Sequence, residues 1–366
     1  MSFLKKIQNN LPLAFPKYME MALYDHEFGY YTTHQHILGP KGDFITAPEL
    51  TPLFGLTFAK QIQAIFSNLS HPCFLELGAG SGRLCVDVLK GLELFNQLPQ
   101  YYYILEISPV LKDFQQQRIQ QEIPHLSSRV VWLSEWPNPS FEGVILANEV
   151  LDAMPVHRFE WRDGEVFESM IVWNKDQQQL QETFCLSTNA QLIQYVKNLD
   201  LGDSVYRSEV NLWIPGWLSG MNSCLSKGVV LLIDYGFPRR EFYHPDRFEG
   251  TIMCHQRHKA HADFLNQPGL CDITAHVDFT HVAEEAHHLF FSILGYTHQA
   301  AFLLANGILD ELAKIEDELA YQKQATYLKL LLQSQEMGEI FKVMALGKNF
   351  QWPLKGFSLQ DKRVSL

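Results

Sequence analysis

The stretch Cys73-Phe74-Leu75-Glu76-Leu77-Gly78-Ala79-Gly80-Ser81-Gly82 decides the fold of this 366-residue chain. It begins as a short apolar run, passes directly into closely spaced glycines, and is followed by the helical pattern Leu84, Val86, Val88 and Leu89. A strand that leads through a glycine turn into a helix begins a doubly wound α/β unit. Glycines in such a turn let the backbone bend tightly and let a ligand approach it closely.

Further apolar runs of strand length recur at the spacing of strand–helix repeats. With residues 73–77 they predict a buried, mainly parallel sheet, because strands covered on both faces are continuously hydrophobic. A last strand is expected at residues 341–346, and residues 302–304 fit either a neighbouring strand or a helix. The expected fold class is therefore α/β, with helices on both faces of the sheet. The runs are residues 101–105, 130–133, 143–147 and 229–233.

The other segments predict how the chain is divided. Residues 1–70 contain a helical stretch, a loop rich in Gly, Pro, Asp and Tyr, and an apolar helix, which indicate an N-terminal helical cap with a lid segment. Residues 156–225 break the strand–helix rhythm with a hairpin pattern around Asp163-Gly164, so we expect an inserted hairpin and helical subdomain on the substrate side. Residues 71–155 and 226–366 are then the core that carries the sheet.

Composition and charge narrow the classes of function. The chain is 46% hydrophobic and carries 29 Lys and Arg against 41 Asp and Glu, for a formal net charge of −12. Because phosphate backbones are neutralised by clustered basic residues, nucleic acid is not an expected partner. The apolar runs stop far short of the ~20 residues that span a bilayer, so no membrane insertion is expected. The first residues lack the pattern of a signal or transit peptide, which favours a cytoplasmic location.

Cysteine and histidine spacing argues against a metal site. The 6 cysteines form no C-x-x-C pair, so neither a disulfide framework nor a thiolate zinc site is indicated. Histidines are dense between His255 and His298, but the spacing His255-x-x-His258-x-x-His261 has no matching set of further ligands. We therefore expect no metal, and we consider the pair His276 and Asp278 as a weaker acid–base candidate.

The glycine turn and two carboxylates predict the kind of cofactor. Arg83 stands where the dinucleotide fingerprint G-x-G-x-x-G has its third glycine, which disfavours NAD. Glu76 would repel a pyrophosphate and attract an ammonium group, and Glu106 lies at about the spacing from the turn at which a carboxylate binds ribose hydroxyls. These features predict S-adenosylmethionine, although a glycine turn alone would also fit a structural role. The expected cofactor-binding residues are Glu76, Gly78, Gly80, Gly82 and Glu106.

Two more residues are candidates for the adenine end of the cofactor. Glu135 and Trp136 follow the third predicted strand, where an adenine ring could be flanked. Trp136 stands next to Pro137, and simple packing would explain it equally well.

Several longer blocks, spread from about Tyr24 to Leu346, resemble a known family. They are Asp25-x-Glu27-x-Gly29-Tyr30-Tyr31, Gly42-Asp43-Phe44-Ile45-Thr46-Ala47-Pro48-Glu49, Glu76 to Gly82 as quoted above, Ala147-Asn148-Glu149-Val150-Leu151-Asp152-Ala153-Met154-Pro155, Ile233-Asp234-Tyr235-Gly236, Asp272-Ile273-Thr274-Ala275-His276-Val277-Asp278-Phe279 and Met337-Gly338-x-x-Phe341-Lys342-Val343. These blocks are similar to the MidA family of class I S-adenosylmethionine-dependent methyltransferases. Departures include Ala79 and His26, where the family commonly has proline, and Met253-Cys254-His255, where an Arg-Ala-Tyr-like stretch is typical.

The resemblance implies a Rossmann-like methyltransferase fold and a protein substrate. The family is related to the mitochondrial complex I assembly factor that methylates a protein arginine, so it implies methyl transfer to an arginine of a protein such as a complex I subunit. A non-catalytic assembly chaperone that keeps the cofactor fold is the alternative, since fold does not decide function. An oxidoreductase is a third reading, disfavoured by Arg83 and Glu76. The oligomeric state, including a homodimer, is left open.

The catalytic candidates lie after the fourth predicted strand. Asn148 and Glu149 end that strand, at the sheet edge where ligands bind. Glu149 and Asp152 are close enough in sequence for a turn to point both carboxylates into one cleft. An arginine side chain needs such carboxylates, because its guanidinium is planar, permanently charged and recognised by paired oxygen acceptors. We therefore predict that Asn148, Glu149 and Asp152 are catalytic, with Asn148 also near the cofactor. Helix capping by Glu149 and an ion pair at Asp152 are the structural alternative.

The cap loop supplies two further cofactor candidates. Asp43 and Thr46, with Glu49, lie in a Gly- and Pro-containing loop that we expect to act as a lid over the cofactor. Turn and helix-cap chemistry, with Pro48 at a helix start, fits the same residues.

Overall fold

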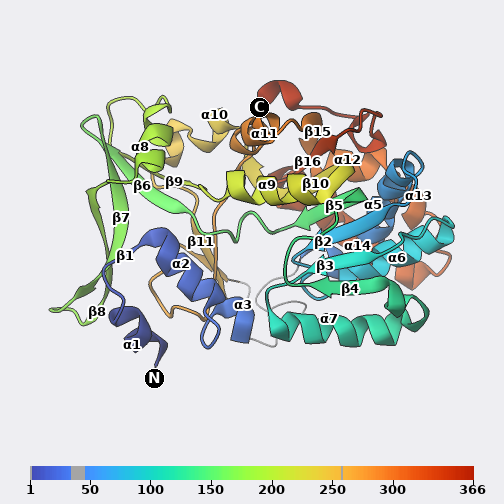
Figure 1. The fold of residues 1–366 in the computed structure, drawn as a ribbon, viewed down its shortest axis with the longest axis horizontal. Coiled ribbons are helices and arrows are strands. Elements are labelled where there is room, and N and C mark those ends of the chain that lie inside the picture. The colour runs from blue at the N-terminus through green and yellow to red at the C-terminus, as the bar shows by residue number, and fades with distance from the viewer. Residues whose placement is uncertain (1, 34–45, 257–258) are drawn as a thin grey trace.

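The computed structural model describes residues 2–33, 46–256 and 259–366. These residues form two lobes that lie side by side along the longest axis of the molecule (Figure 1). The larger lobe is built around a mainly parallel sheet. The smaller lobe, which contains the N-terminus, is built around antiparallel strands.

The central sheet confirms the expected α/β fold class. Its strand order is β15-β16-β10-β5-β2-β3-β4, and β10, β5, β2, β3 and β4 run parallel. β16 is antiparallel to both of its neighbours, β10 and β15. Along the chain, β3 and β4 are added on one side of β2, and β5 and β10 are then added on its other side. Ligands bind where the direction of strand addition reverses in this way. The strands are β2 (Cys73–Leu77), β3 (Tyr102–Leu105), β4 (Val130–Leu133), β5 (Phe141–Asn148), β10 (Leu225–Phe237), β15 (Ser292–His298) and β16 (Phe341–Lys348).

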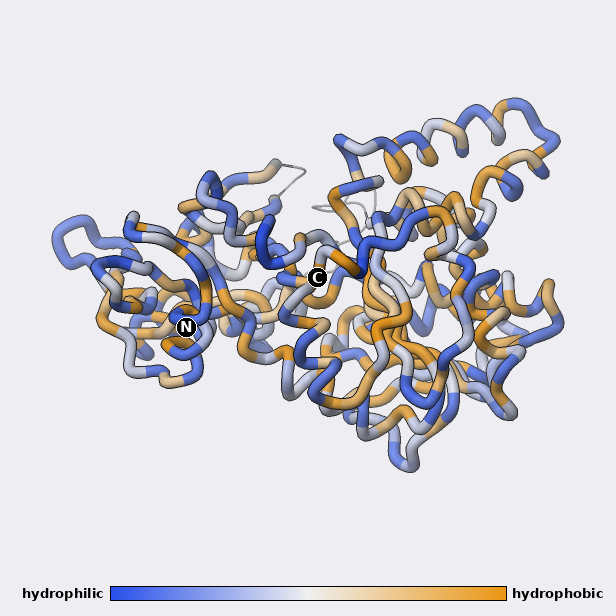
Figure 2. Tube along the Cα trace, turned by 90° about the horizontal axis from the view of Figure 1, so that it is seen from above, coloured by the Kyte–Doolittle hydropathy of each residue, from blue (hydrophilic) through white to orange (hydrophobic). Residues whose placement is uncertain are grey.

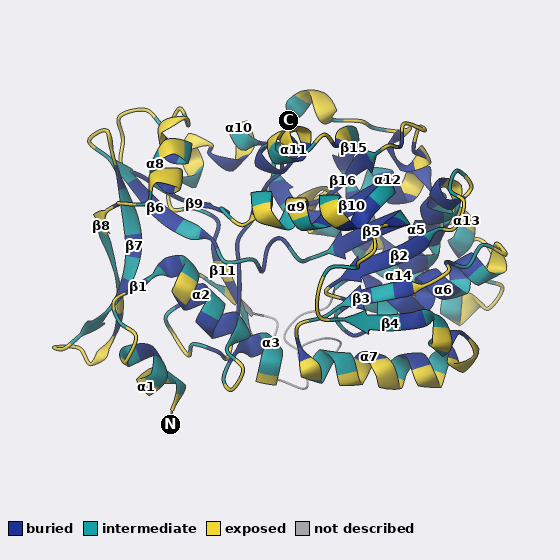
Figure 3. Cartoon of the chain, viewed as in Figure 1, coloured by how far each residue is buried: buried dark blue, intermediate teal, exposed yellow. Residues whose placement is uncertain are grey.

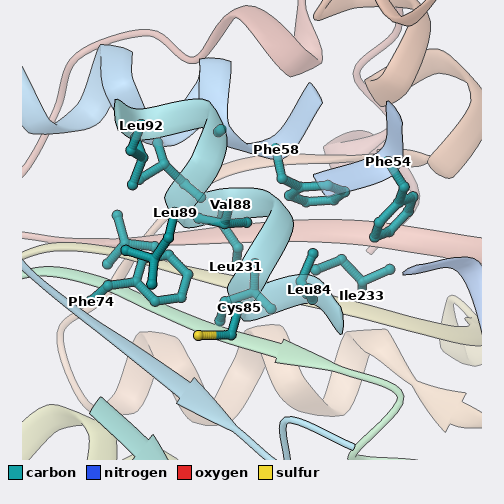
Figure 4. Close-up of a cluster of buried hydrophobic side chains, with 14 of the residues drawn as sticks. Phe54, Phe58, Phe74, Leu84, Cys85, Val88, Leu89, Leu92, Leu231 and Ile233 are labelled. Carbon is teal, nitrogen blue, oxygen red and sulfur yellow. The ribbon is translucent and has the colours of Figure 1, made fainter. Parts of the chain in front are cut away.

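Helices cover both faces of this sheet. Leu84, Val88 and Leu89 of α6 lie in one buried cluster with Phe54 and Phe58 of α5 and with Phe74, Leu231 and Ile233 of the sheet (Figure 4). Each fully buried side chain of this size contributes about 1.5–3 kcal/mol relative to an exposed one. Residues 302–304, which fitted a strand or a helix, lie in a helix. One face carries α5 (Pro52–Phe66), α6 (Arg83–Leu94), α7 (Pro109–Glu122), α12 (Gln299–Ala305), α13 (Ile308–Leu312) and α14 (Glu318–Leu332), and the other carries α9 (Ile214–Cys224) and α11 (Phe279–His288).

The smaller lobe contains the predicted hairpin. Asp163 and Gly164 have φ of 54° and 76°, the left-handed values that a two-residue hairpin turn requires. The N-terminal strand β1 pairs with the hairpin strand β7, so distant parts of the chain share one sheet. The elements are β1 (Leu13–Ala14), β6 (His157–Arg162), β7 (Glu165–Asn174), β8 (Gln179–Leu186), β9 (Tyr206–Val210) and α8 (Ala190–Lys197).

A second set of short strands packs beside the N-terminal helices. Tyr18 and Met19 of α2 share one hydrophobic cluster with Ile171 of β7, Cys254 of β11 and Ile273 of β13. The core of the small lobe is therefore assembled from the predicted cap, the predicted insertion and the segment after β10. The elements are α1 (Phe3–Gln8), α2 (Phe15–Tyr24), β11 (Met253–Gln256), β12 (Lys259–His261) and β13 (Asp272–Thr274).

Burial and hydropathy follow this architecture. The central strands are buried, whereas α7 presents an exposed outer face (Figure 3). Hydrophobic residues gather inside both lobes and hydrophilic residues at the outer turns (Figure 2). Within the described residues, no helix has the length and apolar character needed to cross a membrane. The remaining short elements are α3 (Tyr30–Thr33), α4 (Ala47–Leu50), α10 (Arg239–Phe242), β14 (Val277–Asp278), η1 (Pro124–Arg129), η2 (Pro245–Arg247), η3 (Ser334–Gly338), η4 (Lys355–Phe357) and η5 (Arg363–Ser365).

Candidate active site

A cavity of about 1170 Å³ lies at the carboxyl ends of β2, β3, β5 and β10. Small-lobe residues, among them Tyr31 and Asp272, line it together with the strand ends of the large lobe. Its volume exceeds the ~300–1,000 Å³ of a typical small-molecule site. The cavity therefore has room for more than one ligand.

The glycine turn forms one wall of the cavity. Gly78, Gly80 and Gly82 have φ of 60°, 51° and 77°, left-handed values that favour glycine. Gly78 and Gly80 line the cavity, whereas Gly82 precedes the first residue of α6 and packs against Gln115. The turn thus exposes backbone to the cavity at two of the three predicted glycines.

Glu76 is a buried carboxylate at the end of β2. It lines the cavity, and its Oε2 accepts a hydrogen bond of 2.7 Å from the Tyr102 hydroxyl. Burial raises the pKa of Glu76 to about 7; the Tyr102 hydrogen bond opposes this rise and the Glu106 carboxylate adds to it. A cationic group beside Glu76 would restore its ionised form, so the site suits an ammonium group.

Glu106 is held in place by groups that the sequence did not single out. Its carboxylate accepts hydrogen bonds from the backbone N–H of Ser108 at 2.9 Å and from Nε2 of Gln115 at 2.8 Å. Burial raises the pKa of Glu106, and these hydrogen bonds oppose the rise. The buried Gln115 also donates to the Gly80 carbonyl at 2.9 Å, so it ties Glu106 to the glycine turn. Gln115 is one of several glutamines in its helix and carried no distinguishing pattern.

The adenine candidates lie on the cavity wall. Glu135 is exposed and Trp136 half-buried, and both line the cavity after β4. The Trp136 indole packs closely over Gly220 of α9, where a Cβ would collide with it. Trp136 therefore both packs against α9 and lines the cavity.

Asn148 and Glu149 turn the chain out of β5. Glu149 has φ of 54°, and its N–H donates to the Ile233 carbonyl at 2.9 Å. Such a conformation costs on the order of 1–3 kcal/mol, and it recurs at functional sites. Nδ2 of Asn148 donates to Oε1 of Glu149 at 3.0 Å. The buried Oδ1 of Asn148 has no hydrogen-bond partner among the described residues.

Three carboxylates meet behind this turn. Burial raises the pKa of Glu149 to about 8, the Asp152 carboxylate adds to the rise, and the Asn148 hydrogen bond opposes it. Burial likewise raises the pKa of Asp152 to about 6, opposed by a hydrogen bond with Tyr235. Asp234, which the sequence analysis named only as part of a family-like block, accepts the backbone N–H of Leu151 at 2.9 Å and of Asp152 at 3.3 Å. It therefore fixes the turn that brings Glu149 and Asp152 to one cavity.

The end of the cap loop contacts the same cavity. Thr46 lines it, and the backbone N–H of Ala47 is hydrogen-bonded to Glu149. The Glu49 carboxylate accepts hydrogen bonds from the Ser81 hydroxyl and, at 2.8 Å, from Nη1 of Arg118. These bonds connect α4 to the glycine turn. Asp43 lies outside the described residues.

The structure does not form the suggested pair of His276 and Asp278. His276 lines the cavity with its ring against Tyr235 and Phe237, and burial lowers its pKa to about 4. Asp278 instead caps the N-terminus of α11 and accepts a hydrogen bond of 2.9 Å from the Tyr195 hydroxyl. Over the described part of the chain, no group of three or more His, Cys, Asp or Glu side chains is arranged to hold a metal ion.

These groups define a class of protein. Three features fit a nucleoside that carries an ammonium group: a sheet of this order, a turn in which Gly78 and Gly80 line the cavity, and buried acids at the ends of β2 and β3. The predicted S-adenosylmethionine is such a nucleoside. The fold and cavity are therefore those of a nucleoside-dependent, Rossmann-like enzyme.

Comparison with known proteins gives the family. Residues 54–297 match the family described as "Putative S-adenosyl-L-methionine-dependent methyltransferase". The crystal structure of a protein from Burkholderia thailandensis bound to S-adenosyl-homocysteine is similar, with a TM-score of 0.94 and 33% sequence identity over 100% of this chain and 96% of that chain. The chain belongs to this family of methyltransferases, and its cofactor is S-adenosylmethionine. The sequence-based resemblance and the expected cofactor are confirmed.

Curated relatives of similar length carry more specific names. The Drosophila melanogaster protein named "Protein arginine methyltransferase NDUFAF7 homolog, mitochondrial" is 27% identical, over 96% of this chain and 87% of its own. The Homo sapiens protein named "Protein arginine methyltransferase NDUFAF7, mitochondrial" is 28% identical, over 93% and 81%. The expectation of a cytoplasmic location is wrong by this comparison, because these relatives are mitochondrial. The cytoplasmic expectation rested only on the absence of a recognisable targeting pattern, and such an absence is not physical evidence for a location.

Proposed function

We propose that this protein transfers the methyl group of S-adenosylmethionine to an arginine of a protein substrate. The observation that carries the proposal is one cavity lined at one wall by the glycine turn and Glu106, and at another by Glu149 and Asp152. The names of the relatives, which are protein arginine methyltransferases, support the same reaction.

Within this proposal, the cofactor lies along the glycine turn. The Glu106 carboxylate accepts hydrogen bonds from the ribose hydroxyls, and Glu76 pairs with the ammonium group. Gly78 and Gly80 let the ligand approach the backbone, Glu135 and Trp136 flank the adenine, and Thr46 closes the site from the cap. When bound, the cofactor supplies an electrophilic methyl group on a sulfonium. Asp43, in the same cap loop, is proposed as a further contact.

Glu149 and Asp152 act on the acceptor. Their carboxylates hold the guanidinium by paired, charge-assisted hydrogen bonds and orient one nitrogen for in-line attack. The unpartnered Oδ1 of Asn148 accepts a further N–H from the same group. Methylation leaves that nitrogen with a proton to lose, and Glu149 accepts it. A carboxylate with a pKa raised to about 8 is well matched to this role near neutral pH.

The proposed acceptor is a protein of the respiratory complex I subunit type. This part rests on the sequence resemblance, and the acidic net charge of −12 mildly favours a basic target segment. Quantitative mass spectrometry of cells with and without this protein tests it. Loss of a methylarginine from one or a few proteins supports the proposal. An unchanged set of methylarginines in cells that lack the protein argues against it.

Cofactor binding should depend on pH through Glu76. The pKa of Glu76 is raised to about 7, so the carboxyl becomes protonated as the pH falls below that value, and it then no longer attracts an ammonium group. Because about a tenth of the group is ionised one unit below its pKa, we expect roughly fivefold to tenfold weaker binding at pH 6 than at pH 7.5. Calorimetry at both pH values measures this. In Glu76→Gln, binding should be weak at both, and an equally steep pH dependence in the variant would assign the effect to another group.

A further inference from the structure

A carboxylate from the smaller lobe faces the proposed acceptor site. Asp272 begins β13, is only 3% exposed, and lines the cavity. The Tyr31 hydroxyl donates to its Oδ1 at 2.9 Å. The strand that carries Asp272 is tied to the opposite lobe, because the backbone N–H of Ala275 donates to the Asp152 carbonyl at 2.9 Å. This backbone bond joins the segment that follows Asp272 to the turn that carries Asp152, and both aspartates line the same cavity.

Asp152 supplies a second, independent observation. It is 5% exposed and lines the cavity, and its Oδ1 is buried without a hydrogen-bond partner among the described residues. An unpaired buried carboxylate oxygen costs free energy that a charged donor would recover. Among the described residues, no cationic side chain therefore pairs with this oxygen.

Aromatic rings enclose the same space. Tyr24 and Tyr31 are stacked with ring centroids 5.6 Å apart, and the Tyr24 hydroxyl donates to the Ala153 carbonyl at 2.8 Å. Tyr235 lines the cavity beside Asp152. Aromatic faces attract cations, and a planar guanidinium stacks on them better than an ammonium does. Arg83, a basic residue among those that line the cavity, is already paired with Asp87 and Glu122.

We propose that Asp272, oriented by Tyr31, completes with Asp152 a guanidinium pocket through which the smaller lobe selects arginine over lysine. The inference rests on the proposed function and adds a specificity-determining residue to it. A guanidinium has five N–H donors in a fixed fork, which acceptors on two lobes can share, whereas an ammonium has three on a single atom. Asp272 binds the acceptor equally in the ground state and during transfer, so it governs KM and not kcat.

Binding of a small probe tests the pocket without the protein substrate. N-methylguanidinium is titrated into the protein loaded with S-adenosylhomocysteine, with methylammonium as the comparison, and bound probe is followed by ligand-observed NMR. We expect the wild type to prefer methylguanidinium. Asp272→Asn should weaken its binding on the order of 30-fold, the loss typical of removing one partner of a buried charge pair. Tyr31→Phe should weaken it less.

Matched controls separate this role from folding. Asp163→Asn makes the same chemical change at an exposed position in the hairpin turn. Asparagine tolerates the positive φ of this position, so the variant should fold and bind the probe as the wild type does. Affinity for S-adenosylhomocysteine should be the same in all variants. With an acceptor protein, Asp272→Asn should raise KM and preserve kcat.

The outcomes distinguish this inference from the proposed function. If the wild type methylates arginine and Asp272→Asn binds the probe and the acceptor normally, the role of Asp272 is wrong and the function stands. If the wild type binds methylammonium more tightly and no methylarginine depends on the protein, the proposed function itself is overturned.

Discussion

Replacing Glu149 by glutamine is expected to slow methyl transfer about a hundredfold, the scale seen when one well-placed electrostatic group is removed from an active site. Glutamine keeps the size of the side chain and can still accept the hydrogen bond from Asn148. It removes the charge that we propose to pair with the guanidinium and the oxygen that we propose to accept the proton. The proposed cofactor site lies along another wall of the cavity, so cofactor affinity should barely change.

The control for this variant lies on the same strand. Glu142 is near the opposite end of β5, where its carboxylate accepts the backbone N–H of Ser70 at 3.2 Å. Glu142→Gln should transfer methyl groups at the wild-type rate. Rates are measured with isotope-labelled cofactor at saturation, and affinities by calorimetry with S-adenosylhomocysteine. A Glu149→Gln variant that transfers normally to the native substrate would show that Glu149 has no part in the reaction.

Gly80→Val should abolish cofactor binding, with a loss of more than a hundredfold. Gly80 has φ of 51°, which a β-branched residue adopts only at high cost, and it lines the cavity. The Gly80 carbonyl also receives the Gln115 hydrogen bond, so a shift of the turn would disturb the support of Glu106. Both effects act on the proposed cofactor site.

A second glycine separates backbone strain from loss of the site. Gly164 has φ of 76° in the exposed hairpin turn, and a Cβ there would meet nothing within 4 Å. Gly164→Val introduces similar strain far from the cavity and should bind the cofactor normally. Calorimetry gives the affinities, and circular dichroism confirms that both variants are folded. Wild-type affinity in Gly80→Val would remove the glycine turn from the proposed cofactor site.

The core of the fold was predictable because its strands are buried on both faces. Residues 130–133 were predicted at the bounds observed for β4, and the predicted run 229–233 lies inside the longer β10. Continuous apolar runs make such strands visible in the sequence. The reversal between β2 and β5 then places a ligand site at their carboxyl ends, where Glu76, Glu106 and Glu149 were expected.

The smaller lobe was less predictable because it depends on pairing between distant segments. β1 is only two residues long, too short to show a periodic pattern, and nothing in its sequence indicates that Leu13 pairs with Ile171. The role proposed for Asp272 depends on the backbone hydrogen bond from Ala275 to Asp152, which no local motif indicates. Gln115 likewise acts through hydrogen bonds to the Gly80 carbonyl and to Glu106, which lie in two different loops. Contacts between such distant segments can be identified only in the folded structure.

The most direct test of the account is transfer of a trideuteromethyl group from labelled S-adenosylmethionine. Purified protein is incubated with an extract of cells that lack it, and labelled peptides are located by tandem mass spectrometry. We expect label on arginine guanidinium nitrogens with wild-type protein and about a hundredfold less with Glu149→Gln. Label confined to other residue types would contradict arginine methylation by this protein. So would an absence of any label while Glu149→Gln still restores the partner complex in cells, which would make the protein an assembly chaperone.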